Sequence, residues 1–216
     1  MYRKEYTVTV MGAAGVGKTS FISQFISGIF PHEDDPTMDL SNRKLCLVDD
    51  ERVLFDILNT ASMEECSAML EVCMERCEVM IIIYSITNRE SFLHVSTFGH
   101  NLLQLKKKDY FPMLVVGTRS DEHHEREVST EEGMAFASQN RCGFLEASTK
   151  SNHNIEKAFY DIAHEIRQYS RDHPPLPHRM PFCGICNSDR GSYGIVDEKD
   201  LSDFDGPHIT YAQKTL

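Results

Sequence analysis

The sequence contains no apolar run that approaches the roughly 18 residues of a membrane-spanning helix. It also has no surplus of basic residues, since 22 Lys and Arg stand against 33 Asp and Glu and the formal net charge is −11. A protein that coats nucleic-acid phosphates needs a basic face, so we expect no nucleic-acid partner. The same charge disfavours simple electrostatic attachment to an anionic membrane.

A secretion signal is also lacking, because the first residues, MYRKEYTVTVMG, lead into an alternating strand pattern without an apolar signal core. The seven Cys residues are odd in number and irregularly spaced. Without an export signal, such a set is typical of reduced thiols and not of a disulfide framework. We therefore expect a cytoplasmic protein.

Segments typical of strands and of helices alternate over the first 171 residues, which we predict to form one domain. This alternation predicts an α/β fold with a mostly parallel sheet and helices on both faces. Residues 172–216 are rich in Pro, Gly, Asp and Ser and lack periodicity, so we predict a mostly disordered tail. The expected strands are 6–12, 44–50, 52–58, 79–86, 111–118 and 142–148. The clearest expected helices are 18–27, with Gly28 as the stop, 91–108, 129–140 and 154–171.

The stretch GAAGVGKTS, residues 12–20, matches the phosphate-loop pattern G-x-x-x-x-G-K-[ST] between the first predicted strand and the first predicted helix. Gly15 and Gly17 let backbone N–H groups approach phosphate oxygens, and the helix N-terminus adds a positive dipole. Lys18 supplies positive charge to the terminal phosphates, and the Thr19 hydroxyl suits Mg²⁺. The predicted phosphate-binding residues are Ala14, Gly15, Val16, Gly17, Lys18, Thr19 and Ser20.

Four further motifs follow in a fixed order: DDPTMDLSNRK with Thr37, DILNTASMEECSAM after a strand, VVGTRSD with Asp121, and EASTK with Ser148 and Lys150. With these motifs the chain resembles the Ras family of small GTPases over residues 6–169. The resemblance implies a P-loop NTPase with the Ras-like domain, in which a six-stranded mixed sheet is flanked by helices on both faces. It also implies that the chain binds GTP, GDP and Mg²⁺.

The resemblance assigns the base-binding places as well. The Asp121 carboxylate would accept the N1–H and N2–H₂ groups of guanine together, a donor pair that adenine does not present. Thr118 and Arg119 stand where the family motif has Asn and Lys, and the alkyl stem of Arg119 can lie along the base. The other places that the resemblance implies around the base are Phe30, Ser148, Thr149 and Lys150.

Four places that control hydrolysis depart from the family pattern. Ala14 puts a methyl group where the family has Gly, in the path of the attacking water and of an inserted arginine. Asn59 lacks the charge of the family's Asp, so Mg²⁺, held by Thr19 and Thr37, should bind more weakly. Ser62 replaces a Gly whose N–H meets the γ-phosphate, and the Met63 thioether cannot orient water as the family's Gln does. We expect slow GTP hydrolysis, with Met63 and Ala14 as altered catalytic positions beside Lys18. The alternative is that the four changes are neutral and are compensated elsewhere in the chain.

We therefore predict a guanine-nucleotide-dependent switch of intracellular signalling. The resemblance implies an effector that contacts switch I, residues 34–42, and switch II, residues 59–75, and it implies an exchange factor. The changed sequence DLSN at 39–42 favours effectors other than those of Ras. Two other hypotheses are a nucleotide-independent pseudo-GTPase scaffold and a P-loop phosphotransferase, the latter disfavoured by the base-binding motifs.

The tail carries Cys183 and Cys186 in a single C-x-x-C pair, which is half of a zinc site. His178 and His208 are the candidates to complete it. Acylation of the two Cys residues is the better hypothesis, because Ras relatives anchor through the tail at the inner face of the plasma membrane. The last residues, AQKTL, contain no C-a-a-X box, and one lipid signal gives marginal membrane contact.

Overall fold

The computed structural model describes residues 4–28, 41–61 and 67–173. Within these ranges the strands are β1 (Lys4–Gly12), β2 (Ser41–Val48), β3 (Glu51–Asn59), β4 (Val79–Ser85), β5 (Met113–Thr118) and β6 (Gly143–Glu146). The helices are α1 (Lys18–Ser27), α2 (Ser67–Arg76), α3 (Arg89–Lys106), α4 (Thr130–Gln139) and α5 (Ile155–Asp172), with a short 3₁₀ turn at His123–Glu125.

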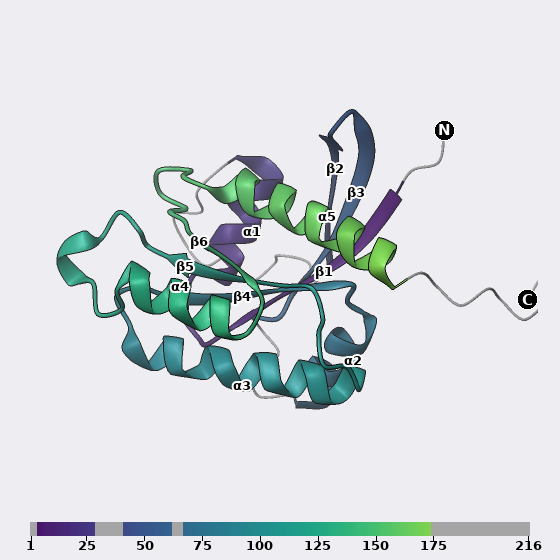
Figure 1. Cartoon of the computed structure of the whole chain (residues 1–216). Coiled ribbons are helices and arrows are strands. Elements are labelled where there is room, and N and C mark those ends of the chain that lie inside the picture. Colours follow the sequence, from purple (N-terminus) through teal and green to yellow (C-terminus); the bar gives the residue numbers. More distant parts are fainter. Residues whose placement is uncertain (1–3, 29–40, 62–66, 174–216) are drawn as a thin grey trace, which may run out of the picture. The chain divides into compact units, whose positions relative to one another are not determined.

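The six strands form one sheet in the order β2-β3-β1-β4-β5-β6 (Figure 1). β2 runs antiparallel to β3, and every other neighbouring pair is parallel. The expected six-stranded, mixed and mostly parallel sheet is thereby confirmed. All seven residues of β4 are buried, as the apolar run predicts for a strand covered on both faces.

The β2–β3 hairpin turns at Asp49 and Asp50, whose φ angles are 50° and 64°. A two-residue hairpin turn with positive φ at both central positions matches the right-handed twist of the strands, and Asp tolerates this conformation. The strand expected over residues 44–50 therefore ends at Val48, and Asp49 and Asp50 form the turn to β3.

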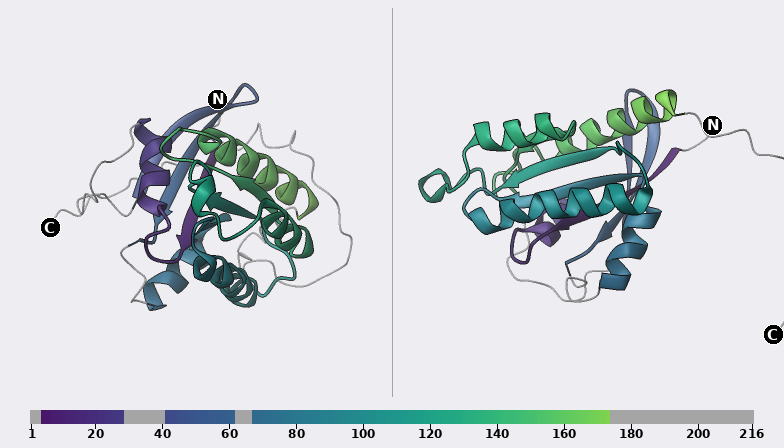
Figure 2. Two further views of the ribbon diagram at one scale, coloured as in Figure 1. Left: turned by 90° about the vertical axis from the view of Figure 1, so that its left-hand side faces the viewer. Right: turned by 60° about the horizontal axis from the view of Figure 1, so that its bottom comes forward.

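Helices cover both faces of the sheet (Figure 2). α1 and α5 pack on one face, where the rings of Phe25 and Phe159 stack with centroids 3.6 Å apart. α2, α3 and α4 lie on the other face, where Met74, Val95 and Phe136 pack against the side chains of β4 and β5. Two cores, one on each side of the sheet, thus hold the strand ends in fixed positions.

Local signals end most helices where the sequence predicts. Gly28 closes α1 in the left-handed conformation with φ of 69°. Ser129 and Glu132, which have the spacing of a capping box in the sequence, form that box at the start of α4. α3 begins two residues before the predicted start, because the side chain of Asn88 accepts a hydrogen bond from the Ser91 N–H and caps the helix.

α5 continues to Asp172, one residue beyond the predicted domain end. Residues 174–216, which hold Cys183 and Cys186, lie outside the described residues. The division of the chain at residue 171 therefore stays a prediction.

Candidate functional site

The phosphate loop joins the end of β1 to the start of α1. Gly15 and Gly17 have φ angles of 72° and 93°, in the left-handed region that favours glycine. Gly12 is needed for close packing instead, since a Cβ atom there would lie 2.2 Å from the carbonyl oxygen of Ile83. This backbone path turns the loop around the N-terminus of α1, the arrangement that binds phosphate.

Lys18 is the charged group at the centre of the loop. Its side chain is 3% exposed, and Nζ donates hydrogen bonds to the carbonyl oxygens of Gly12 at 3.0 Å and Ala13 at 2.8 Å. The ammonium group is thus held inside the curve of the loop by backbone dipoles, next to the exposed Ala14. A fixed buried positive charge in this place suits a polyphosphate.

Asn59, the last residue of β3, reaches the first turn of α1. Its Nδ2 donates to Oγ1 of Thr19 at 3.2 Å, and its Oδ1 accepts from the backbone N–H of Ala61 at 3.1 Å. The structure therefore brings together the two described residues that the sequence assigned to the metal. Asn59 faces Thr19 as a hydrogen-bond donor, which the sequence did not reveal.

The base-binding motif follows the end of β5 and is tied to the phosphate loop. Oγ1 of Thr118 lies 2.7 Å from the carbonyl oxygen of Val16 and 2.9 Å from that of Tyr84, so one hydroxyl is shared between two acceptors. Arg119 has a left-handed φ of 60°, and its Nη2 donates to the carbonyl oxygen of Gly15 at 3.2 Å. Sequence reasoning gave Arg119 a role along the base and missed this contact, for which a sequence carries no local signal.

The second base-binding loop, residues 148–150, follows β6. Ser148 is buried, exchanges backbone hydrogen bonds with His153, and accepts a hydrogen bond from the Ser151 N–H through Oγ. The Ser120 N–H donates to the carbonyl oxygen of Ala147 at 3.1 Å, which joins this loop to the motif after β5. Ser148, Thr149 and Lys150 thus lie in the loop next to the Asp121 motif, and their contacts with the base stay predictions.

Asp121 is exposed, and no other described residue donates a hydrogen bond to its carboxylate. A carboxylate with both oxygens available can accept a pair of donors from a ligand. This is the property that the predicted guanine contact requires.

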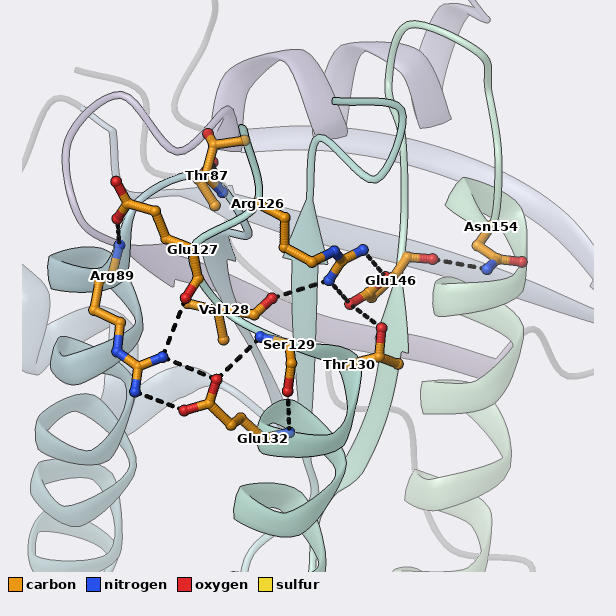
Figure 3. A network of polar contacts seen from close by, with 11 residues as sticks. Thr87, Arg89, Arg126, Glu127, Val128, Ser129, Thr130, Glu132, Glu146 and Asn154 are labelled. Carbon is orange, nitrogen blue, oxygen red and sulfur yellow. Dashed lines mark hydrogen bonds and ion pairs between the residues drawn. The ribbon is translucent and has the colours of Figure 1, made fainter. Parts of the chain in front are cut away.

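A network of charged side chains joins the end of β6 to the residues around the start of α4 (Figure 3). Arg126 holds the Glu146 carboxylate through two hydrogen bonds of 2.7 and 2.8 Å, and Thr130 adds a third of 3.0 Å. Burial by itself raises the pKa of Glu146, but the bonds from Arg126 and Thr130 outweigh burial and lower that pKa. The carbonyl oxygen of the same residue accepts from Asn154 at 2.7 Å, which fixes the end of β6 directly before the loop.

The same network continues to the start of α3. Arg89 pairs with Glu132 through two hydrogen bonds of 2.9 and 2.6 Å, and it also donates to the carbonyl oxygen of Glu127 (Figure 3). These bonds join the N-termini of α3 and α4. The sequence contained the capping box of Glu132 but no signal for its pairing with a residue 43 positions earlier.

Phe30, Thr37, Ser62 and Met63 lie outside the described residues. So do nearly all of switch I and residues 62–66 of switch II, and their assignments stay predictions. No described group of three or more His, Cys, Asp or Glu residues is placed to hold a metal ion. None of the helices in the described ranges has the length and hydropathy of a membrane span.

These positions converge because they lie at, or directly after, the carboxyl ends of parallel strands. The strands β1, β3, β5 and β6 end in this way at residues 12–20, 59, 118–121 and 148–150. Connections leave β1 and β4 toward opposite faces of the sheet, and ligands of open α/β sheets bind at such a switch point. The topology of the sheet therefore brings the motifs found in the sequence to one edge of the sheet.

Comparison with known proteins agrees with this geometry. The Ras family profile matches residues 7–168. A Ras-like protein of Laccaria bicolor is 46% identical over 171 residues, which cover 79% of this chain and 82% of that protein. Protein ras-1 of Neurospora crassa is 38% identical over 204 residues, which cover 94% of this chain and 92% of ras-1. The resemblance seen in the motifs is confirmed, and neither relative favours a nucleotide-independent scaffold.

The chain belongs to the Ras family and is a guanine-nucleotide-binding switch of signal transduction.

Proposed function

We propose that this Ras-family switch binds GTP through the residues assigned above and hydrolyses it slowly, so that the loaded form is its working state. The observation that carries the proposal is the contact between Asn59 and Thr19. Where the family has a carboxylate, a neutral amide donates to the hydroxyl at the metal place. The phosphate loop and base-binding loops keep the groups needed for affinity, whereas the places that serve turnover are altered.

The chemistry of hydrolysis depends on a water that is positioned for attack on the γ-phosphate. Met63 offers a thioether, which is a weak acceptor and has no donor, in place of the family's amide. Ala14 adds a methyl group on the exposed side of the phosphate loop, where an arginine from an activating partner would enter. In Ras such a partner accelerates hydrolysis by up to about 10⁵-fold, and both changes oppose that gain.

Thr19 and Thr37, together with the phosphates, would hold Mg²⁺ in this site, because Mg²⁺ is commonly bound by few protein ligands and by substrate oxygens. The ion, when bound, neutralises charge on the β- and γ-phosphates. These residues suit Mg²⁺ only in part, since Asn59 adds no negative charge to the site.

Partners are proposed on the same basis. Proteins of this family bind effectors and exchange factors, and we assign the effector contacts to switch I, residues 34–42, and switch II, residues 59–75. Acylated Cys183 and Cys186 would give marginal contact with the inner face of the plasma membrane. Binding of a standard Ras-binding domain with Ras-like strength would contradict the altered effector preference.

A single-turnover assay with GTP-loaded protein tests slow hydrolysis directly. We expect turnover at or below the intrinsic rate of Ras, about 3–5 × 10⁻⁴ s⁻¹, without acceleration by a Ras-activating domain. The double variant Ala14→Gly, Met63→Gln should hydrolyse faster and respond to that domain. Met134→Gln, the same chemical change at an exposed position of α4, is the matched control and should behave as the wild type. Partner-accelerated turnover in the wild type would contradict the proposal.

The nucleotide that co-purifies provides a second test, read by chromatography after denaturation. GTP is the expected result for a switch held in its loaded form. GDP would indicate efficient turnover, and absence of any nucleotide would support the scaffold hypothesis.

A further inference from the structure

The side chain of Asn59 has a further role in the nucleotide site, which rests on the proposed function. This residue is 6% exposed and lies at the end of β3, beside the first turn of α1. Its two polar atoms face different groups: Oδ1 is 3.1 Å from the Ala61 nitrogen, and Nδ2 is 3.2 Å from Oγ1 of Thr19. Asn59 therefore links the start of switch II to the helix that follows the phosphate loop.

The orientation of the amide follows from its partners. The backbone N–H of Ala61 can only donate, so the atom that faces it must be the acceptor Oδ1. Nδ2 is consequently the atom directed toward Thr19. The flipped orientation would place two donors against each other at 3.1 Å.

The amide nitrogen carries two hydrogens, and one of them is used by Thr19. No further acceptor for Nδ2 is found among the described residues, although the residue is more than nine-tenths buried. A buried donor without a partner is unfavourable, so the second hydrogen needs an acceptor, and an oxygen of a bound ligand can supply it. The place beside Thr19 is where the phosphate loop receives the phosphates.

In the contact between Asn59 and Thr19 the Asn59 side chain donates the hydrogen bond, whereas a carboxylate in its place could only accept one. A carboxylate beside Thr19 would add negative charge and accept hydrogen bonds from metal-bound water, and both effects favour a divalent cation. The amide adds a donor and occupies one of the two lone pairs of the Thr19 hydroxyl. Together with the buried ammonium of Lys18, the site presents fixed hydrogen-bond donors, one of them positively charged, to a phosphate without an added cation.

We propose that Asn59 is a phosphate-binding residue, and that its amide N–H lets this chain hold guanine nucleotides almost independently of Mg²⁺. The Thr19 hydroxyl fixes one hydrogen of the amide, and the second donates to a phosphate oxygen of the bound nucleotide. Nucleotide retention then depends on the protein's own donors, and chelation of the metal does not release the nucleotide.

The test is the dissociation constant of fluorescent GDP for the full chain, measured with Mg²⁺ and with excess chelator. We expect the wild-type value to change by less than about threefold on chelation. Asn59→Asp should make binding depend on the metal, with a loss of at least about tenfold on chelation, since a charged hydrogen-bonding group is involved. Asn59→Ala should weaken binding about tenfold under both conditions, because the donor is lost. Asn101→Asp, which adds the same charge at an exposed position of α3, is the matched control and should bind as the wild type.

The outcomes separate this inference from the proposed function. Tight binding by the wild type that falls more than about tenfold on chelation, with no larger effect in Asn59→Asp, would overturn the role of Asn59 and leave the switch function intact. Absence of GDP and GTP binding under all conditions would overturn both. Circular dichroism melting of each variant shows whether a loss of binding follows from a loss of fold.

Discussion

The Asp121 carboxylate and the Tyr84 hydroxyl show how far single residues decide the properties of this protein. Asp121 is exposed with its oxygens available, whereas Tyr84 is fully buried with a hydroxyl that has no hydrogen-bond partner among the described residues. The Asp121 carboxylate can bind a ligand, whereas the unpaired Tyr84 hydroxyl destabilises the core. Each leads to a prediction about one functional group.

Replacing Asp121 by Asn should shift the base preference from guanine toward xanthine. The substitution removes a charged acceptor for the N2–H₂ group of guanine and supplies an N–H donor for the C2 carbonyl of xanthine. We expect guanine affinity to fall about 10- to 100-fold while xanthine affinity rises. Competition of GDP and XDP against a fluorescent nucleotide measures the change. Asp109→Asn, an exposed carboxylate loss in the loop before β5, is the control, and unchanged guanine affinity in Asp121→Asn would mean that Asp121 was misassigned.

Replacing Tyr84 by Phe should stabilise the fold. Burial raises the pKa of the Tyr84 hydroxyl well above its usual range, and the group stays neutral and unpaired in the core. Removing a buried unpaired polar group should raise the free energy of unfolding by about 1–3 kcal/mol, measured by denaturant unfolding. Tyr110→Phe is the matched control: its hydroxyl donates to Glu165 at 3.1 Å, so the same change there should destabilise by about 1 kcal/mol. A destabilised Tyr84→Phe would contradict the argument.

Secondary-structure elements cooperate around the base-binding loops. The ion pairs Arg89–Glu132 and Arg126–Glu146 connect the starts of α3 and α4 and the end of β6 (Figure 3). Only the second pair is substantially buried, with side chains 21% and 15% exposed. The pair at Glu132 is more exposed, so it serves as a probe of acid sensitivity more than as a large source of stability.

Acid should weaken the link between α3 and α4. The hydrogen bond from Arg89, and then that from the Ser129 backbone, lower the pKa of Glu132 from its ordinary value of 4.5 to about 2. A depressed folded-state pKa means that the stabilisation is complete above about pH 4.5 and is lost as the pH falls toward about 2. Between these values the wild type should lose more stability than Glu132→Gln, as measured by denaturant unfolding at each pH. Glu131→Gln, the exposed neighbour, should keep the wild-type acid dependence, and an equal dependence in all three proteins would contradict the assignment.

Two glycines inside helices should respond to alanine in opposite directions. Gly99 lies within α3 above a cavity of about 90 Å³, where a Cβ atom would sit at an ordinary 3.8 Å from Ile82 and Met113. Gly99→Ala should therefore raise the free energy of unfolding by about 1 kcal/mol, through helix propensity and filled space. Gly133→Ala is the matched control in α4 and should destabilise, because its Cβ atom would lie 2.4 Å from the ring of Phe144. Thermal melting of both variants measures the difference, and a shared sign would contradict the packing argument.

For the whole molecule, the nucleotide should act as part of the fold. The site joins loops that follow β1, β3, β5 and β6, so a ligand that binds them together stabilises the native state alone. At a free GDP concentration of about 100 times the dissociation constant the gain is about 2.7 kcal/mol, which corresponds to a rise in melting temperature of about 5–10 °C. ADP at the same concentration is the control and should give a much smaller shift, because adenine lacks the donor pair for Asp121. Equal shifts for both nucleotides would contradict guanine selectivity.

The sequence by itself determined the class of fold, the family and the identity of most candidate site residues. These depend on patterns that are local in the chain: buried strand runs such as residues 79–85, the capping box of α4, and the glycines of residues 12–17. Binding loops of α/β proteins follow strand ends, and each of these motifs lies at the end of a predicted strand. Phe30, Thr37, Ser62 and Met63 stay predictions, since the structure does not describe them.

Only the tertiary structure decided how the assigned groups face one another. The Asn59 amide is oriented by Ala61 and Thr19, and Arg119 and Thr118 bind carbonyl groups of the phosphate loop more than 100 positions away. The unpaired Tyr84 hydroxyl likewise becomes evident only where β4 meets β5 and α4. The physical reason is that a hydrogen bond depends on distance and direction to within a fraction of an ångström, and the packing of two cores against one sheet sets these quantities.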